Sequence, residues 1–544
     1  MRPRAGTSST SHDTDGTDDD RRHAATTGPT VMKTRLASVG RRLWRSRAAR
    51  NAAASYFAFA SAAICGLISI PITVRYLDKA EIGLWAVVSN VVAYLLWIDL
   101  GVGEATGRKM AEAIAHDDAA EVNRWWTTSL TVLAIQGAVM FMVALTVLPF
   151  LDSFLRLDSR LARDARFLFL GLVAVSALGM PVRAYPGILL AQERFYWVSV
   201  GHGIMPWVQL LVFGTLLKVG FGMRSYLVAS AASCMVGWTL FVIQTHRGNT
   251  RFSLDRQGLT RTRLASLFRY SGSIAVMGLT TTAMQSLPSL ILARLGGLAL
   301  VPVYSFSNYC PGMLRGLTAR TAHAFYPNLQ RMFVVGERER MTGKIQAVNL
   351  LAIGMSLVAA GGILVGNRSI VEWVAHREFY AGAVATGWMA VSVILLTLLS
   401  CFTDLLQISG SLGRIAFLNM MQLIAGAVLL WLGYGWAGIA GLAAAAAVVP
   451  ILFQGPYSLI RGAENCGLKP RQIAGYICLV AALGCTSVIV LSHWLSTLVI
   501  TSSDVVVMHR TTRLPTAAEW VAGLAVAIPG VAIAMRQIVQ LKRG

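Results

Sequence analysis

Charged residues are scarce in this chain of 544 residues, making up 14% of it, whereas hydrophobic residues make up 55%. Soluble domains contain about 25% charged and about 45–50% apolar residues. The sequence also lacks the GxxxxGKS or GxxxxGKT phosphate loop, the HExxH zinc motif and the GxSxG nucleophile motif. These absences argue against a soluble enzyme and against a built-in ATPase of the phosphate-loop type.

The seven cysteines show no CxxC spacing, and most of them fall within apolar segments, where a thiol behaves as a small hydrophobe. We therefore expect no disulfide framework, no metal site and no cofactor. The predicted outer loops are poor in carboxylates: the longest, near 496–518, has Asp504 as its only clear interior acid. General acid–base catalysis needs groups that give and take protons, so the sequence argues against an enzyme such as a polysaccharide polymerase or ligase.

Long apolar blocks make up most of the chain. A hydrocarbon core about 30 Å thick needs roughly 20 apolar residues per helix, and the sequence supplies that length many times. We predict an all-α polytopic membrane protein with about 14 transmembrane helices. The expected spans lie near 52–74, 82–104, 127–150, 166–190, 197–218, 225–244, 270–293, 299–321, 345–366, 383–406, 414–433, 437–459, 472–495 and 519–538.

Basic residues outnumber acidic ones by 48 to 26, which gives a net charge of +22. On a soluble protein such a balance would suggest nucleic acid as a partner. Here most Lys and Arg fall in the loops on one side of the predicted spans, as expected for residues that fix membrane topology. We therefore predict cytoplasmic N- and C-termini and no nucleic-acid partner.

The first twelve apolar blocks divide into two groups of six, which predicts two pseudo-symmetric lobes. Arg75 and Arg294 each end a span ahead of a short hairpin, and an aromatic residue, Trp85 or Tyr304, follows near the start of the next span. Internal repeats of this kind are common in transporters. The predicted organisation is a disordered and then basic tail over 1–50, an N-lobe over 51–244, a basic cytoplasmic linker over 245–269, a C-lobe over 270–460, and two extra spans with a short tail over 461–544.

One GxGxxG pattern occurs, at Gly433, Gly435 and Gly438. In a nucleotide-binding fold this pattern joins a strand to a helix, but here it joins two predicted membrane spans. We therefore expect a tight turn with close helix packing at these glycines, and no bound nucleotide.

Charged groups at membrane depth are costly and usually face the bundle interior or a cavity. Arg183 is the deepest, and Asp99 lies roughly 7.5 Å from the end of its span. We expect these two side chains to line a polar cavity or to form a mutual ion pair within the N-lobe. Arg315 and Asp404 lie nearer the inner ends of their spans, where snorkelling to the interface is the alternative for Asp404. For Arg75 and Arg294, at outer ends, the alternative is interfacial anchoring.

Three segments resemble bacterial polysaccharide transporters, which are oligosaccharide flippases of the multidrug/oligosaccharidyl-lipid/polysaccharide exporter superfamily. They are IPITVRYLDKAEIGLW from Ile70 to Trp85, WIDLGVGEATGR from Trp97 to Arg108, and GILLAQERF from Gly187 to Phe195. The predicted C-lobe is similar chiefly around ARLGGLALVPVYS, from Ala293 to Ser305, and in its span spacing. The order of these motifs, together with fourteen expected spans, carries the resemblance.

The resemblance implies two lobes around a central cavity that opens alternately to each face of the bacterial inner membrane. The implied cargo is an oligosaccharide linked through pyrophosphate to a polyprenol, moved from the inner to the outer leaflet. Arginine is a good phosphate partner through its planar donor fork, so we expect headgroup contacts from arginines and a sugar contact from the polar face of the span at 270–293. The candidates are Arg75, Arg183, Arg294 and Arg315 for the headgroup and Gln285 for sugar hydroxyls.

Asp99 and Asp404 are the candidate coupling carboxylates, because the missing ATPase motif leaves an H⁺ or Na⁺ gradient, or consumption of the product, to drive transport. Expected partners are membrane lipids, glycosyltransferases and a polysaccharide polymerase. The alternatives of the same superfamily are a lipid II flippase and a multidrug exporter, which typically has twelve spans and should favour cavity carboxylates because its cargo is cationic. A scaffold without transport is the remaining alternative.

Overall fold

A computed structural model of the chain describes residues 47–155, 158–247, 253, 255, 259–323, 325–408 and 412–465. Residues 1–54 and 55–544 form separate compact units. Of residues 1–54 the structure describes only the first turns of one helix, and all the other described helices belong to residues 55–544. The predicted spans at 472–495 and 519–538 and most of the tail over 1–50 lie outside the described residues.

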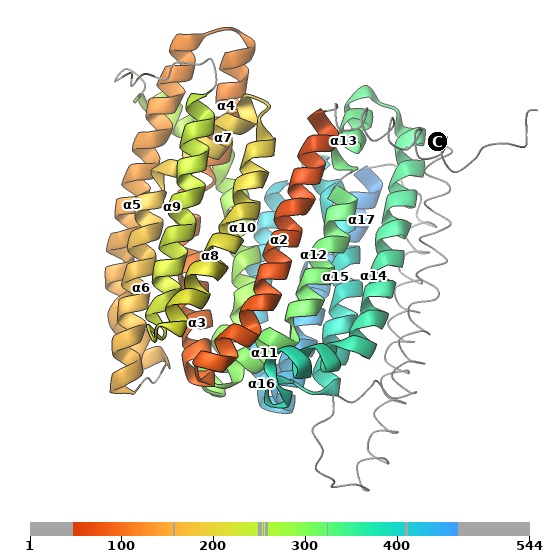
Figure 1. The fold of residues 1–544 in the computed structure, drawn as a ribbon. Helices are drawn as coiled ribbons and strands as arrows, with labels where there is room; N and C mark the ends of the chain where they lie inside the picture. The colour runs from red at the N-terminus through yellow and green to blue at the C-terminus, as the bar shows by residue number, and fades with distance from the viewer. Residues whose placement is uncertain are drawn as a thin grey trace, which may run out of the picture. The chain divides into compact units, whose positions relative to one another are not determined.

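The described residues are helical and contain no strand, as predicted (Figure 1). The helices of the predicted N-lobe are α2 (Arg47–Tyr76), α3 (Lys79–Leu95), η1 (Leu96–Asp99), α4 (Val102–Ala115), α5 (Ala119–Leu155), α6 (Ser159–Gly179), η2 (Pro181–Arg183), α7 (Ala184–Ala191), α8 (Phe195–Lys218) and α9 (Arg224–His246). Those that follow are α10 (Arg261–Leu295), α11 (Leu300–Ser307), α12 (Tyr309–His323), α13 (Tyr326–Val335), α14 (Arg338–Ala375), η4 (Arg377–Phe379), α15 (Ala383–Ile408), α16 (Leu412–Phe453) and α17 (Gly455–Asn465).

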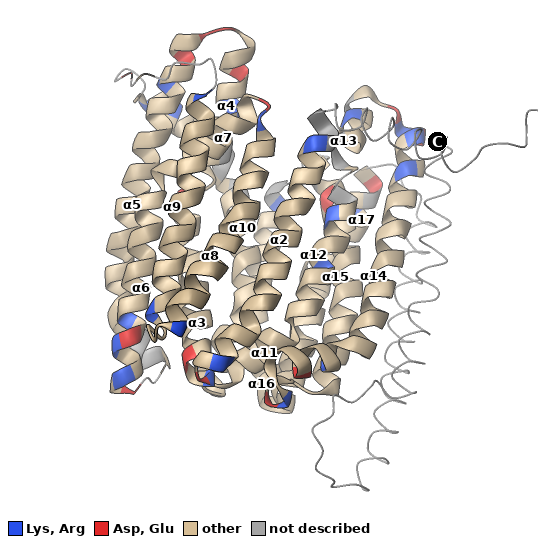
Figure 2. Cartoon of the chain, in the orientation of Figure 1, with Lys and Arg blue, Asp and Glu red and all other residues tan. Residues whose placement is uncertain are grey.

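Nine described helices are long and apolar enough to cross a membrane, and one bent pair, α6 with η2 and α7, raises the number to ten. The protein is therefore a multi-pass membrane protein. Most charged residues lie toward the ends of these helices, and the long middle parts consist mainly of uncharged residues (Figure 2). The predicted span at 299–321 is broken into the short helices α11 and α12 at Asn308, so neither piece alone has the length of a span.

Helix α16 covers two predicted spans because its arms are joined by a tight turn. The backbone leaves helical geometry at Ala437 and at Gly438, where φ is +59°. Gly433 and Gly441 face each other across the turn, and a side chain at Gly433 would come within 2.6 Å of the Gly441 carbonyl. The predicted turn with close packing at these glycines is confirmed.

One buried apolar cluster joins helices of both predicted lobes. Leu84 and Val87 of α3 share it with Leu172 of α6, Leu292 of α10 and Val301 of α11. The hairpins at the starts of α3 and α11 also meet closely, because Gly83 lies against the backbone of Leu298. This shared core fixes α3 beside α11.

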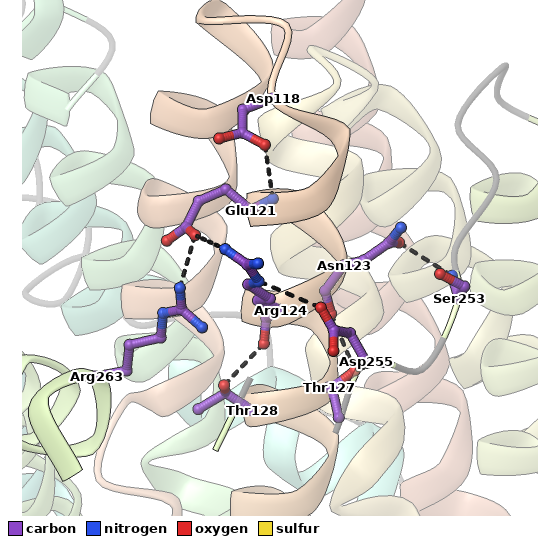
Figure 3. Close-up of polar contacts among 9 residues, drawn as sticks. All are labelled: Asp118, Glu121, Asn123, Arg124, Thr127, Thr128, Ser253, Asp255 and Arg263. Atoms are coloured by element: carbon purple, nitrogen blue, oxygen red, sulfur yellow. Dashed lines mark hydrogen bonds and ion pairs between the residues drawn. The ribbon is translucent and has the colours of Figure 1, made fainter. Parts of the chain in front are cut away.

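The predicted linker over 245–269 makes specific contacts with the N-terminal turns of α5 (Figure 3). The Ser253 amide donates to the Asn123 side chain over 3.0 Å, and the Asp255 amide donates to Thr127 Oγ1 over 2.8 Å. Arg124 Nε lies 3.2 Å from an Asp255 carboxylate oxygen. At these points the linker is therefore bound to α5 by hydrogen bonds and an ion pair.

The same surface of α5 binds the first turn of α10. Arg263 Nη2 donates to Glu121 Oε2 over 2.7 Å, and its guanidinium lies 5.6 Å from the centroid of the Trp125 ring. Asp118 accepts the Glu121 amide over 2.9 Å and so fixes the turn that presents this carboxylate (Figure 3). The first helix of the predicted C-lobe thus begins on a helix of the predicted N-lobe.

Candidate functional site

Two spans of the predicted N-lobe are interrupted and packed together at their breaks. The first passes through η1, and Leu100 and Gly101 then take positive φ values of 51° and 70° before α4 begins. The second breaks at η2, which begins at Pro181. Beyond the breaks, α4 and α7 approach through Gly107 and Gly187, where a side chain at Gly107 would come within 2.7 Å of the Gly187 carbonyl. Glycine therefore permits the backbone contact that holds the breaks side by side.

The two breaks bring Asp99 and Arg183 together. Arg183 Nη1 donates to an Asp99 carboxylate oxygen and also to the Leu96 carbonyl over 3.3 Å. The other carboxylate oxygen of Asp99 accepts the Gly101 amide over 2.9 Å, and Gln136 donates to the Asp99 carbonyl over 3.2 Å. Of the two expectations for this pair, the structure shows the mutual ion pair. The charge of Arg183 is thus balanced within the protein.

The broken span also contacts the polar run of α10, which consists of Thr280, Thr281, Thr282, Gln285, Ser286 and Ser289. Trp97 Nε1 donates to Thr282 Oγ1 over 2.8 Å, and the Tyr94 hydroxyl donates to the Ala283 carbonyl over 3.3 Å. The Trp97 ring lies directly against Gly278. Part of the polar run therefore connects helices, whereas Gln285 is exposed and forms no hydrogen bond with the described residues.

Arg315 differs from Arg183. It is half-buried within α12, and among the described residues its guanidinium forms neither an ion pair nor a hydrogen bond. The buried Tyr304 phenol lies within electrostatic reach of it. On the same helix, Arg320 donates to Ser55 Oγ over 3.1 Å and lies 4.7 Å from the centroid of the Phe59 ring. Arg315 is thus an interior cation that the described part of the protein leaves available.

The other predicted site residues are dispersed. Arg75 is exposed in the last turn of α2, 5.9 Å from the Tyr76 ring centroid, and Arg294 is half-buried in the last turn of α10. Asp404 is buried in α15. Of the seven predicted residues, Asp99 and Arg183 are the pair that the described structure places in contact.

A cavity of about 430 Å³ lies between α2, α3, α8, α9, α11 and α12. Its polar lining comes from Ser69, Thr73, Gln209 and Ser305, together with two tyrosines. Among the described residues that line it there is no Asp, Glu, Lys, Arg or His. None of the predicted site residues lines this cavity: six of the seven are charged, whereas the described lining is neutral. A usable signal was present in Ser69 and Thr73, which lie one turn apart on the same helix face.

Aromatic rings build one wall of the cavity. Trp85 stacks on Tyr226 with ring centroids 3.9 Å apart, and Phe213 stacks on the same tyrosine at 4.2 Å. The Tyr226 hydroxyl lies 3.3 Å from Thr73 Oγ1. The Tyr309 hydroxyl donates to the Ala63 carbonyl over 2.8 Å, and it lies where a side chain at position 66 would be, so Gly66 makes this bond possible. The wall is therefore held by packing and hydrogen bonds between α2, α3, α8, α9 and α12.

Solved structures of transporters share this fold. The lipid II flippase MurJ in an inward closed conformation aligns with a TM-score of 0.63 and 12% identity, covering 90% of this chain and 99% of that one. An inward-facing multidrug resistance MATE family transporter of the MOP superfamily gives 0.59 and 13%, covering 77% and 99%. The eukaryotic MATE transporter AtDTX14 gives 0.58 and 15%, covering 77% and 97%. No family model and no curated protein matches the sequence.

Proposed function

We propose that the protein is a flippase that moves polyprenyl-pyrophosphate-linked oligosaccharide from the inner to the outer leaflet by alternating access, for O-antigen, exopolysaccharide or capsule biosynthesis. The observation that carries the proposal is Arg315, an interior arginine with no ion pair or hydrogen bond among the described residues. An ionisable side chain at membrane depth is costly unless it meets a counter-charge or water. An anionic cargo supplies that counter-charge.

Pyrophosphate fits this arginine better than a single carboxylate would. The guanidinium presents several donors in a planar fork, which matches the oxygens of a phosphate. Arg75 and Arg294 lie at the ends of α2 and α10, also without an ion pair among the described residues, and are proposed as further headgroup contacts. Gln285 is exposed on α10 and is proposed to meet sugar hydroxyls.

A multidrug exporter of cations is the weaker reading. Its cavity should offer carboxylates, but the described lining of the 430 Å³ cavity holds no carboxylate, and Asp99 is already paired with Arg183. Asp404 remains the proposed coupling group for an H⁺ or Na⁺ gradient. A lipid II flippase shares the lipid-pyrophosphate chemistry and differs in the sugar that it moves, so it stays the closer alternative.

The proposed cargo also implies in which membrane, and with which enzymes, the protein would act. The protein is proposed to act in the bacterial inner membrane with both termini in the cytoplasm. Glycosyltransferases on the inner face would make the lipid-linked unit, and a polymerase on the outer face would consume it. Consumption of the product on the outer face would itself favour outward movement.

The test measures on which leaflet lipid-linked oligosaccharide accumulates in cells lacking the gene, complemented with wild-type protein, Arg315→Met or Arg331→Met. Arg331 is an exposed arginine of α13 and serves as the matched control. We expect accumulation on the cytoplasmic leaflet in the deletion and with Arg315→Met, and rescue by wild-type and Arg331→Met at equal protein levels. Unchanged surface glycan and no lipid-linked intermediate in the deletion would refute the proposal.

A further inference from the structure

We propose that the cavity between α2, α3, α8, α9, α11 and α12 is a subsite for an uncharged sugar residue of the cargo. The proposal rests on the proposed function and assigns a second site to it, separate from the arginine that meets the phosphates. It is carried by the lining of the cavity: neutral hydrogen-bonding groups on some sides and a stacked aromatic wall on another.

Two polar side chains of the lining, those of Ser305 and Gln209, are available to a ligand. Ser305 forms no hydrogen bond with the described residues, and Gln209 makes a single long contact of 3.4 Å to Ser230 Oγ. A hydroxyl and a primary amide both donate and accept. They can therefore meet the hydroxyls of a sugar, which need donors and acceptors together.

The aromatic wall can pack against the apolar faces of a sugar ring. A pyranose ring presents C–H groups on its faces, and Trp85 and Phe306 offer apolar ring surface to the cavity. Because Trp85 is stacked on Tyr226, which is stacked on Phe213, its ring is held in place before a ligand binds. A preorganised wall loses little side-chain entropy on binding.

The described lining is neutral and offers no charged contact to the pyrophosphate of the cargo. No described lining residue is basic, so the pyrophosphate gains nothing by entering. Arg315 lies about 9 Å further along the axis than Tyr309, which lines the cavity from the same helix, α12. Six residues also turn the helix so that Arg315 lies about 120° around α12 from Tyr309, which makes the headgroup contact a site separate from the cavity.

The size of the cavity sets how much of the cargo it holds. Sites for drug-sized ligands occupy about 300–1,000 Å³, and this cavity, at about 430 Å³, lies in the lower part of that range. It accommodates a small part of an oligosaccharide. The subsite would therefore contact one or a few sugar residues of the glycan, and the other residues would lie outside it.

The test compares two kinds of probe on the full-length protein in lipid nanodiscs. One is a polyprenyl pyrophosphate without sugar, and the other is the same lipid carrying one glucose, galactose or N-acetylglucosamine residue. We expect at least one sugar-bearing probe to bind about tenfold more tightly than the bare lipid, as a few neutral hydrogen bonds and a ring contact allow. Equal Kd values for all four probes would overturn the subsite.

Two variants locate the added affinity. Ala62→Leu fills the cavity from α2 without removing a hydrogen bond, and it should bring the Kd of the sugar-bearing probe to that of the bare lipid. Ala60→Leu makes the same change at an exposed position of α2 outside the cavity and should change neither Kd. Ser305→Ala, which removes one hydroxyl and little volume, should weaken the sugar-bearing probe about threefold and leave the bare lipid unchanged.

The outcomes separate the two proposals. Arg315→Met should weaken all four probes by the same factor, because the phosphates are common to them. If Ala62→Leu or Ser305→Ala weakens the bare lipid as much as the sugar-bearing one, the cavity does not hold the sugar and the subsite is wrong. If no probe binds the wild-type protein, the proposed function itself is wrong.

Discussion

Arg183 and Arg315 are interior arginines of the two predicted lobes, and their surroundings differ. Arg183 lies beside the break η2 and is neutralised by Asp99, whose side chain is 13% exposed. Arg315 lies beyond the break between α11 and α12 and has no such partner among the described residues. Arg183 lies in the fourth predicted span of the N-lobe and Arg315 in the second predicted span of the C-lobe, so these are different places: the first holds a paired charge and the second an available one.

The difference separates a structural role from a binding role. Removing one member of a buried ion pair leaves an uncompensated charge, so the pair contributes to stability mainly through what its loss costs. An unpaired interior cation adds no such contact and costs desolvation. In the proposed function, the anionic cargo offsets this cost at Arg315. Two measurements, transport and stability, should therefore respond oppositely at the two arginines.

Arg315→Met is expected to have the largest effect on transport. Hydrogen bonds to charged groups contribute about 1.5–3 kcal/mol, so initial flipping rates at low substrate should fall roughly 10–100-fold. Stability should stay the same or rise, because a desolvated charge is removed. The measurements are flipping of a lipid-linked saccharide in proteoliposomes and the apparent unfolding temperature. A drop in unfolding temperature with wild-type flipping would reverse the assignment of roles.

Asp99→Asn is expected to have the largest effect on stability. It leaves Arg183 without a counter-charge, and we expect a loss of about 2 kcal/mol of unfolding free energy. This is less than the about 3–5 kcal/mol found for fully buried pairs, because the Arg183 side chain is 40% exposed. Denaturant unfolding in mixed micelles measures it.

A second variant checks the cause of that loss. Adding Arg183→Met to Asp99→Asn removes the orphaned charge and should restore about half of the lost stability. If the double variant is less stable than Asp99→Asn alone, the loss comes from the backbone contacts of the break and not from the charge.

Much of the fold could be predicted from the sequence because an apolar run of about 20 residues has the length of a membrane-spanning helix. Each of the first twelve predicted spans overlaps a described helix or a broken pair of helices. The turn at Gly438 was predictable for a local reason too, since closely spaced glycines favour both a positive φ and close packing. The breaks at Leu100 and Asn308 were not predicted. In both cases the flanking apolar residues together have the length of one span, so hydropathy alone does not mark the break, although Gly101 and Pro311 lie beside it.

The candidate site was less predictable, because pairing is a property of the folded chain. The sequence predicts that Asp99 and Arg183 either line a polar cavity or form an ion pair, and only the packing of α4 on α7 decides for the ion pair. The cavity was missed for a different reason. Its polar groups are neutral, so Ser305 and Gln209 do not stand out among many similar residues.

The Glu121–Arg263 pair gives a smaller and independent measure of what pairing contributes. Its side chains are 28% and 18% exposed, and it joins α5 to the start of α10. A double-mutant cycle with Glu121→Gln and Arg263→Met should give a coupling energy of about 1 kcal/mol, between that of exposed pairs and that of buried ones. The same cycle on Arg461 and Glu464, an exposed pair within α17, is the control and should give less. A coupling energy equal to the control would show that the contact between α5 and α10 rests on Trp125 and the linker instead.

The Lys79–Glu378 pair tests whether solvent exposure determines how much an ion pair contributes to stability. Lys79 Nζ lies 3.0 Å from Glu378, but that carboxylate side chain is 61% exposed, so water and salt screen the interaction. Glu378→Gln should change the unfolding free energy by less than about 0.5 kcal/mol. The contact of Lys79 with the Phe379 ring, at 5.0 Å from its centroid, remains in this variant. If Glu378→Gln instead costs as much as Asp99→Asn, then exposure does not separate these ion pairs, and the stability assigned to the Asp99–Arg183 pair loses its physical basis.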